Sequence, residues 1–263
     1  MSVAKEIETP ELEAPEDVII FPPGDLDSDE PPLETYFHLQ QMLLLLKCLD
    51  WWWRDHTDFF AAGNLTVYYS PRQRKSEDFR GPDFFMVLGT ERKPRKSWVV
   101  WEEDGKYPNL IIELLSSSTA TTDKNLKKQI YQDIFRTPEY FWFDPHNLEF
   151  AGFILVGGTY QPIEANPQGW LWSQQLDLFL GICEEKLRFF TAAGELVPTP
   201  EEVAEQEMQR AEQEMQRAEQ EKQRAEQEMQ RAEQEMQRAE QEKQRSDRLA
   251  AKLRELGVDP DSL

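Results

Sequence analysis

The chain has 263 residues, and its 50 acidic side chains outnumber its 29 basic ones, which gives a formal net charge of −21. The mean hydropathy of −0.70 and the 30% of charged residues exclude an integral membrane protein. Two cysteines, Cys48 and Cys183, are too few for a disulfide scaffold or a four-cysteine zinc site. No basic stretch followed by an apolar one marks a signal peptide, so we expect a cytoplasmic protein without a membrane partner.

The first part of the chain, residues 1–34, is acidic and rich in proline. It contains eleven acidic side chains, six prolines and one basic residue, Lys5, for a net charge of −10. Such a segment buries too little apolar surface to offset the chain entropy that folding costs. We therefore expect residues 1–34 to be disordered.

The middle part, residues 35–200, carries a net charge of only −4 and holds all eight tryptophans, which indicates a folded domain. Helical apolar spacing alternates along it with short β-branched or aromatic runs. The predicted elements in chain order are helix 34–56, strands 64–70, 84–88, 98–102 and 109–115, helix 122–135, and strands 140–144, 148–153, 158–162, 187–191 and 195–197. This order predicts an α/β fold with a mixed sheet, in which the nearly all-apolar strand 109–115 is central.

One acidic residue, Glu113, interrupts the apolar strand 109–115. A buried carboxylate is costly unless it is paired, hydrogen-bonded or bound to a metal. Glu113 is therefore either bridged to a basic side chain in the core or part of a site, and the strand alone does not distinguish the two.

Other polar residues could join Glu113 in a site. Asp83 follows a proline at the start of strand 84–88, where an ordinary Pro-Asp turn is the alternative. Asp123, Lys127 and Tyr131 are spaced by four residues and so share one face of the second helix. If that face points at the sheet, Lys127 can reach the carboxylates.

Together these residues carry a resemblance to a known family. Pro-Asp at 82–83, NLIIELLSSST at 109–119, D-x-x-x-K-x-x-x-Y at 123–131 and EYFWFDP at 139–145 resemble the Uma2 family, cyanobacterial-type proteins of the PD-(D/E)xK nuclease superfamily. The resemblance covers about residues 35–200. It implies a restriction-endonuclease-like fold, in which helices flank a mixed sheet.

The resemblance also implies a metal-dependent active site. Asp83 matches the aspartate of the family's PD motif, and Glu113 matches the acidic residue of its (D/E)xK strand. Leu115 stands where the superfamily has its lysine, and Lys127 would supply that lysine from the helix. Asp83, Glu113 and Lys127 would be catalytic. Asp83 and Glu113 would hold Mg²⁺ or Mn²⁺, with the carbonyl of Leu115, or that of Ile112 or Leu114, as the third ligand.

Further residues of the family pattern would support this site or shape the fold. Asp123 and Tyr131 would lie beside it, with Tyr131 positioning the catalytic lysine. The chain departs from the pattern at Arg136 and Thr137, where the family has Gly-Val. We interpret that departure as structural rather than catalytic.

Basic side chains flank the Asp83 motif and the start of the second helix, in an otherwise acidic protein. Such a run is either a solvated loop or a rim that binds phosphate groups. On the second interpretation, DNA would meet four side chains, Arg80, Arg92, Lys124 and Lys128. The three histidines have no metal-ligand spacing and are predicted to be structural: His38, His56 and His146.

The last part, residues 201–263, repeats the unit AEQEMQR six times from Ala204, with lysine replacing methionine at Lys222 and Lys243. Methionine falls at position a of a heptad and alanine at d, which predicts a helix with the thin seam of a weak coiled coil. Glutamate at e and g of every copy would repel in a parallel homodimer. A single solvated helix and a coiled coil, antiparallel or with another protein, are both open.

Two functions are consistent with these observations. The first is a metal-dependent endonuclease that hydrolyses DNA phosphodiester bonds, and a homodimer is a further expectation because nucleases of the superfamily commonly dimerise. The alternative is a catalytically inactive nuclease fold that acts as a binding or assembly module. In that case residues 201–263 would recruit a protein partner.

Overall fold

The computed structural model describes residues 35–70, 79–116 and 123–255. The predicted disordered segment 1–34 and the predicted start of the second helix at residue 122 lie outside the described residues. The chain divides into two compact units between Pro200 and Glu201, and each unit is described by itself.

Helix α1 spans Tyr36–Trp52 and begins the described part of the first unit. Its N-terminus is capped by Thr35, whose hydroxyl oxygen accepts a hydrogen bond from the His38 backbone N–H at 3.2 Å. The cap satisfies one of the backbone donors that the first turn leaves unpaired. The helix ends earlier than the predicted residue 56, because the chain turns after Trp52.

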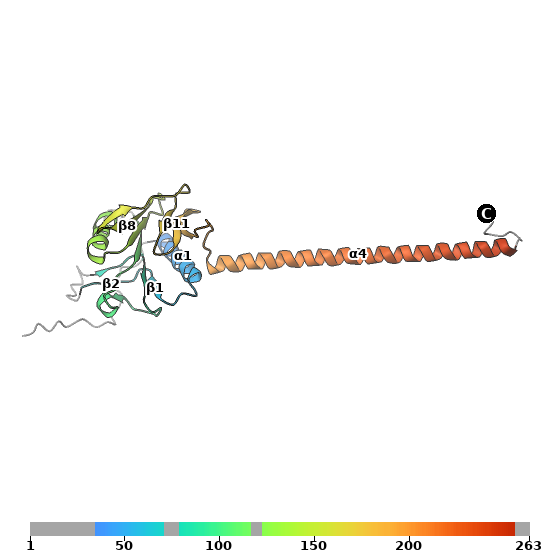
Figure 1. The fold of residues 1–263 in the computed structure, drawn as a ribbon, viewed down its shortest axis with the longest axis horizontal. Helices are drawn as coiled ribbons and strands as arrows, with labels where there is room; N and C mark the ends of the chain where they lie inside the picture. The colour runs from blue at the N-terminus through green and yellow to red at the C-terminus, as the bar shows by residue number, and fades with distance from the viewer. Residues whose placement is uncertain (1–34, 71–78, 117–122, 256–263) are drawn as a thin grey trace, which may run out of the picture. The chain divides into compact units, whose positions relative to one another are not determined.

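A six-stranded sheet lies at the centre of the first unit, in the order β1-β4-β6-β7-β8-β9. Its strands β1 and β8 are labelled in Figure 1. Within the sheet β6 and β7 pair in parallel, and the other neighbouring strands are antiparallel. The predicted α/β fold with a mixed sheet is therefore confirmed, and β6 is internal as expected. The strands are β1 Phe59–Ala62, β4 Phe84–Leu88, β6 Leu110–Leu114, β7 Glu139–Phe143, β8 Phe150–Val156 and β9 Thr159–Pro162.

Among the described residues, two three-stranded sheets accompany the six-stranded one, in the orders β3-β2-β5 and β10-β11-β12. The predicted strand 64–70 shortens to β2, strand 98–102 gives β5 followed by the 3₁₀ helix η1 (Val100–Glu102), and segment 195–197 makes one isolated bridge. Strands β1, β3, β10 and β11 were not predicted. The bounds are β2 Val67–Tyr68, β3 Phe79–Arg80, β5 Trp98–Val99, β10 Leu171–Ser173, β11 Leu178–Cys183 and β12 Lys186–Phe190.

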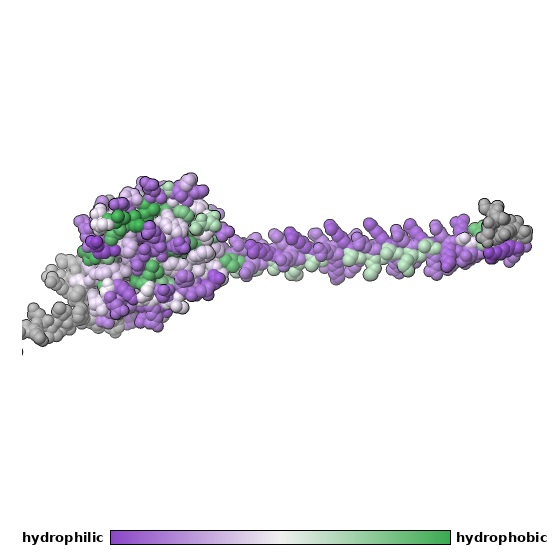
Figure 2. Space-filling view, in the orientation of Figure 1, coloured by the Kyte–Doolittle hydropathy of each residue, from purple (hydrophilic) through white to green (hydrophobic). Residues whose placement is uncertain are grey.

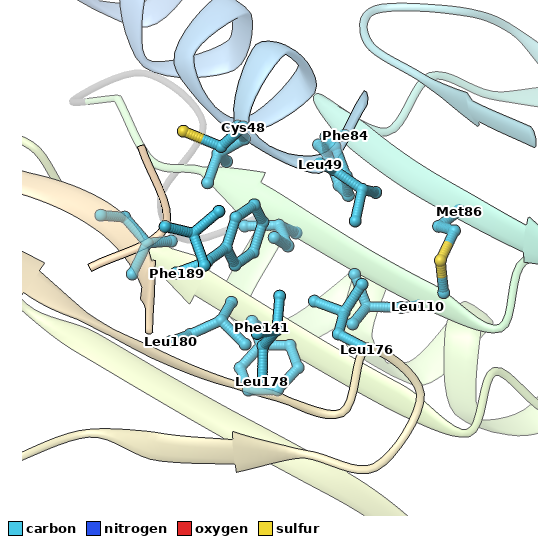
Figure 3. Packing of buried hydrophobic residues seen from close by; sticks show 14 of the residues in the cluster. Cys48, Leu49, Phe84, Met86, Leu110, Phe141, Leu176, Leu178, Leu180 and Phe189 are labelled. Carbon is cyan, nitrogen blue, oxygen red and sulfur yellow. The ribbon is translucent and has the colours of Figure 1, made fainter. Parts of the chain in front are cut away.

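Side chains alternate between the two faces of the six-stranded sheet, and each face has its own core. On one face Phe84, Phe141 and their neighbours pack against α1 and the β10-β11-β12 sheet (Figure 3). On the other face Ile111 and Tyr140 pack against the helical segment 123–135. Residues on the Ile111 side of β6, which include Glu113, therefore face that helical segment.

The helical segment 123–135 is wound unusually. The π-helical turns η2 (Asp123–Lys127) and η3 (Tyr131–Phe135) flank the short helix α3 (Lys128–Ile130). It ends at Arg136, which has left-handed backbone (φ 55°) and donates its N–H to the Tyr131 carbonyl. This conformation normally favours glycine, which has no Cβ to clash with the backbone there.

The second unit is formed by helix α4, which spans Pro200–Glu255. A helix of 56 residues is about 84 Å long. Every residue from 204 to 249 is exposed, and pale hydrophobic patches recur along the otherwise hydrophilic helix (Figure 2). A coiled coil with another chain stays a prediction. In the described ranges, each helix is too short or too polar to traverse a lipid bilayer.

Candidate active site

Asp83 immediately precedes β4 and is held at both carboxylate oxygens. Its Oδ1 lies 2.7 Å from Nε2 of His38 on the first turn of α1. Its Oδ2 accepts a hydrogen bond of 2.7 Å from the backbone N–H of Leu114 in β6. The Asp83 side chain is 13% exposed and that of His38 is 8% exposed. Two different elements thus fix the orientation of a carboxylate that still reaches solvent.

Glu113 lies opposite Asp83 across two antiparallel strands. In the register of β4 and β6, Phe84 is opposite Ile112 and Phe85 is opposite Ile111. Continuing that register by one residue brings Asp83 opposite Glu113. Directly opposed residues point to the same side of a sheet, with Cβ atoms about 5 Å apart. The two carboxylates that the sequence analysis singled out are therefore neighbours.

The Glu113 carboxylate is fully buried, and both of its oxygens are hydrogen-bonded. Oε2 accepts from Nζ of Lys127 at 3.0 Å, and Oε1 accepts from the Tyr131 hydroxyl at 2.6 Å. Both donors come from the helical segment that covers this face of the sheet. Lys127 keeps 20% of its side chain exposed. Glu113 is thus bridged to a lysine in the core and also adjoins Asp83.

The charges around Asp83 favour its ionised form. Burial is the largest effect and opposes a negative charge there, but the hydrogen bond and positive charge of His38, the Lys127 ammonium and a hydrogen bond with Glu113 together outweigh it. Together they hold the pKa of Asp83 below its ordinary value of 3.8. Asp83 is therefore a carboxylate at neutral pH.

Neighbouring carboxylates on β4 and β6 are the type of ligand that Mg²⁺ prefers. Mg²⁺ commonly binds one or two carboxylates and completes its coordination with water and phosphate oxygens. In the described part of the chain, no three or more His, Cys, Asp or Glu side chains form a group that could hold a metal. Asp83 and Glu113 are therefore two carboxylates of the type that Mg²⁺ prefers, without the further acidic or histidine ligands of an all-protein cage within the described residues.

Two other predicted residues lie around this site. Leu115, whose carbonyl is the predicted third ligand, follows β6 directly and donates its N–H to the Phe143 carbonyl at 2.7 Å. Its side chain is buried. Asp123 begins the described helical segment, but its side chain lies outside the described atoms. The roles of both residues stay predictions.

Arg92 lies far from the carboxylates along the strand. It follows β4 whereas Asp83 precedes it, and a strand of this length separates its ends by about 17 Å. The Arg92 guanidinium pairs with Asp50 at 2.7 Å. Its contribution to substrate binding stays a prediction, but contact with a phosphate at Asp83 would need a large movement.

The two predicted helix lysines are closer to the site and already have partners. Lys124 pairs with Glu149 at 2.7 Å. The Lys128 ammonium lies 3.3 Å from the centre of the Phe153 ring, and burial lowers its pKa. Arg80, the fourth predicted contact, belongs to β3, just before the Asp83 motif. The four cations thus do not form one cluster around a single phosphate position.

His38 is the site residue that sequence analysis missed. The sequence offers only an indirect signal, because Thr35 caps the helix and places His38 on its first turn. Nothing local relates that turn to Asp83, which is 45 residues away. The contact arises from the packing of α1 against the sheet.

Comparison with known proteins assigns the chain to a family. The family model described as "Uma2: Putative restriction endonuclease" matches residues 9–201. The chain belongs to the Uma2 family. The matched region begins well before residue 35, so the Uma2 region includes most of the acidic N-terminal segment.

No curated protein matches this Uma2 chain. Among solved structures, it is similar to a crystal structure described as "a putative nuclease belonging to DUF820" from Anabaena variabilis. The sequence identity is 11% and the TM-score is 0.40, over 56% of this chain and 76% of that one.

Proposed function

We propose that this Uma2 protein is a metal-dependent endonuclease that hydrolyses DNA phosphodiester bonds. The observation that carries the proposal is the pairing of Asp83 with Glu113 across β4 and β6, with Lys127 on Glu113. Phosphodiester hydrolysis needs an activated water molecule and positive charge beside phosphorus. Two adjacent carboxylates and a lysine can provide both.

Each residue has a distinct part in the proposed reaction. Asp83 and Glu113, with the Leu115 carbonyl, would hold Mg²⁺ or Mn²⁺, which when bound acidifies a water molecule and polarises a phosphoryl oxygen. Lys127 would orient the attacking water and offset charge that develops on the phosphate. Tyr131 would hold Glu113 and so position Lys127, which is bonded to the same carboxylate.

DNA is the proposed substrate because the family description is that of a restriction endonuclease. The acidity of the whole chain does not oppose this, because residues 35–200 are nearly neutral and the acidic excess lies in the two terminal segments. Arg80, Lys124 and Lys128 would contact the DNA backbone near the site. Lys124 and Lys128 would have to exchange their present partners for phosphate.

A different observation favours a second function. All four carboxylate oxygens of Asp83 and Glu113 already accept hydrogen bonds within the protein. Two predicted DNA contacts, Arg92 and Lys124, are likewise paired with acidic side chains. A site whose carboxylates and neighbouring cations are already paired within the protein is also what an inactive nuclease fold that serves as an assembly module would have.

The test compares two buried glutamates on neighbouring strands. Glu113→Gln removes a proposed ligand, whereas Glu139→Gln changes an equally buried glutamate on β7 that is hydrogen-bonded to Ser173. Full-length protein is incubated with supercoiled plasmid in Mg²⁺, in Mn²⁺ or with a chelator. We expect metal-dependent cleavage that Glu113→Gln lowers by more than about 100-fold and Glu139→Gln preserves.

Two outcomes would contradict the proposal. Cleavage that persists in Glu113→Gln would place the activity at another site or in another protein. A complete lack of cleavage, together with no Mn²⁺ binding in calorimetry, would support the assembly function.

A further inference from the structure

An apolar seam runs along α4, formed by the methionines at heptad position a and the alanines at d. We call it the Met–Ala seam. The four methionines are 70–74% exposed, which is unusual for such large apolar side chains. Figure 2 shows the seam as pale green patches that recur along the helix. Its members are Met208, Met215, Met229 and Met236 with Ala211, Ala218, Ala225, Ala232 and Ala239.

A second copy of α4 is a poor cover for this seam. Glutamate occupies both flanking positions of every heptad, for example Glu212 at e and Glu214 at g. A parallel pair would set e against g, and an antiparallel pair would set e against e and g against g. Either orientation brings carboxylates together on both sides of the seam, and like charges there oppose association.

The flanking carboxylates are incompletely neutralised within the helix. Glu214 has Arg210 four residues before it, at a spacing that allows an intrahelical pair. Glu212 and Glu233, at position e, have only methionine and glutamine three and four residues away on either side. The e flank therefore offers negative charge beside apolar surface, with no basic residue of its own within reach at those two positions.

We propose that residues 204–245 of α4 form a docking surface for a basic amphipathic helix of another protein. Its apolar side chains would cover the Met–Ala seam, and its Lys or Arg residues at e and g would pair with the flanking glutamates. The small alanines at d leave room for large partner residues such as leucine. This inference does not depend on nuclease activity.

Two lysines in the seam specify the register of the partner. Lys222 and Lys243 replace methionine at a, one in each group of three heptads. A single polar residue at an a position can fix the register of a coiled coil at some cost in stability. The partner helix would therefore carry an acidic or amide side chain at every third a position.

The experiment uses the full-length chain and synthetic helical peptides of about six heptads. The basic peptide carries leucine at a and d, lysine at e and g, and glutamate opposite Lys222 and Lys243. A matched peptide carries glutamate at e and g. Binding is measured by fluorescence anisotropy at physiological salt, and we expect only the basic peptide to bind.

Matched variants locate the contact. The double variant Met215→Asp, Met229→Asp places two negative charges in the Met–Ala seam. The control Gln216→Asp, Gln230→Asp places the same two charges on the outer face of the helix, each at the next residue in the sequence. We expect at least about tenfold weaker binding for the first pair and little change for the second. Circular dichroism checks that both proteins keep the helix.

Three results would overturn the proposal. The basic peptide could fail to bind, or it could bind both double variants equally, which would indicate charge attraction without docking. Alternatively, sedimentation could show a dimer of the wild-type chain that the seam variant dissociates, in which case a second copy covers the seam.

Discussion

The carboxylate of Asp83 is held in place by three separate elements. It precedes β4, is bonded by the imidazole of His38 on α1, and accepts the Leu114 N–H of β6. These contacts hold its pKa low even though burial acts in the opposite direction. A ligand of fixed charge and orientation costs little to reorganise when a substrate or metal arrives.

Replacement of His38 by alanine is expected to weaken cleavage by about 10–100-fold, the usual effect of losing a hydrogen-bonded partner of a ligand. Because His38 lowers the pKa of Asp83, its loss raises that pKa. Activity that requires ionised Asp83 is lost as pH falls through its pKa, so the acid limb of the pH–rate profile moves to higher pH. His38→Gln should restore part of the rate.

His56→Ala is the control, since His56 is exposed and stacks on Trp53, away from Asp83. An acid limb that stays in place in His38→Ala would show that His38 does not act through Asp83.

The buried carboxyl group of Glu139 should make the stability of the protein depend on pH, with a sign opposite to that expected for Asp83. Burial raises its pKa above the ordinary 4.5, despite hydrogen bonds from Ser173 and the Gln174 N–H. The folded state therefore binds this proton more tightly than the unfolded state, and the free energy of unfolding falls as pH rises from 4.5 through the raised pKa. Glu139→Gln should flatten this decline in urea titrations at several pH values.

The exposed Glu195→Gln serves as a control that should follow the wild-type curve. Asp83 does not contribute to the decline, because its lowered pKa makes its stabilisation complete above 3.8 and lost only at lower pH. If Glu139→Gln leaves the fall in unfolding free energy with rising pH unchanged, other titratable groups cause that fall.

At the scale of elements, the segment 123–135 is the part of the fold that completes the site. Its face carries Lys127 and Tyr131 onto one carboxylate, and the left-handed residue Arg136 ends it just before β7. The residue at which the helical segment ends matters because the next strand, β7, is the parallel neighbour of β6. The left-handed backbone of Arg136 thus lies directly between the helical segment and the strand that pairs with β6.

Arg136→Gly is expected to raise the free energy of unfolding by up to about 1 kcal/mol, because glycine adopts φ near 55° without the steric cost of a Cβ. Chemical denaturation followed by fluorescence measures the change. Arg136→Ala keeps the strained backbone and should not stabilise the protein. A gain in Arg136→Ala equal to that in Arg136→Gly would trace the effect to the arginine side chain.

For the whole molecule, the two units differ in what stabilises them. The first unit has two apolar cores on opposite faces of a sheet. Helix α4 has exposed side chains from residue 204 to 249 and depends on its backbone hydrogen bonds and helix propensity. Packing makes unfolding cooperative, whereas an unpacked helix frays gradually.

Heating should therefore give two transitions that do not coincide. All eight tryptophans lie in residues 35–200, so tryptophan fluorescence should report one cooperative step. Far-ultraviolet circular dichroism should show that step on top of a broad, gradual loss of helix from α4. Coincident curves from the two probes would show that α4 unfolds together with the first unit.

Much of this protein follows from its sequence alone. The repeat of seven residues predicts α4, apolar spacing predicts α1, and the apolar run around Glu113 predicts an internal strand, because each pattern is contained within one element. The spacing between Lys127 and Tyr131 likewise places both on one helical face. The pairing of these residues with Glu113 agrees with that prediction, while their catalytic roles stay predictions.

Other features were decided only by tertiary structure. Strand β1 gains its pairing from the distant strand β4, and β10 and β11 pair with each other and with β12 in a sheet that packs against one face of the six-stranded sheet. His38 reaches Asp83 because α1 packs on the sheet, and Arg92 lies away from it because a strand intervenes. The local spacing of apolar residues indicates which face of an element is apolar. It does not indicate which distant element packs against that face.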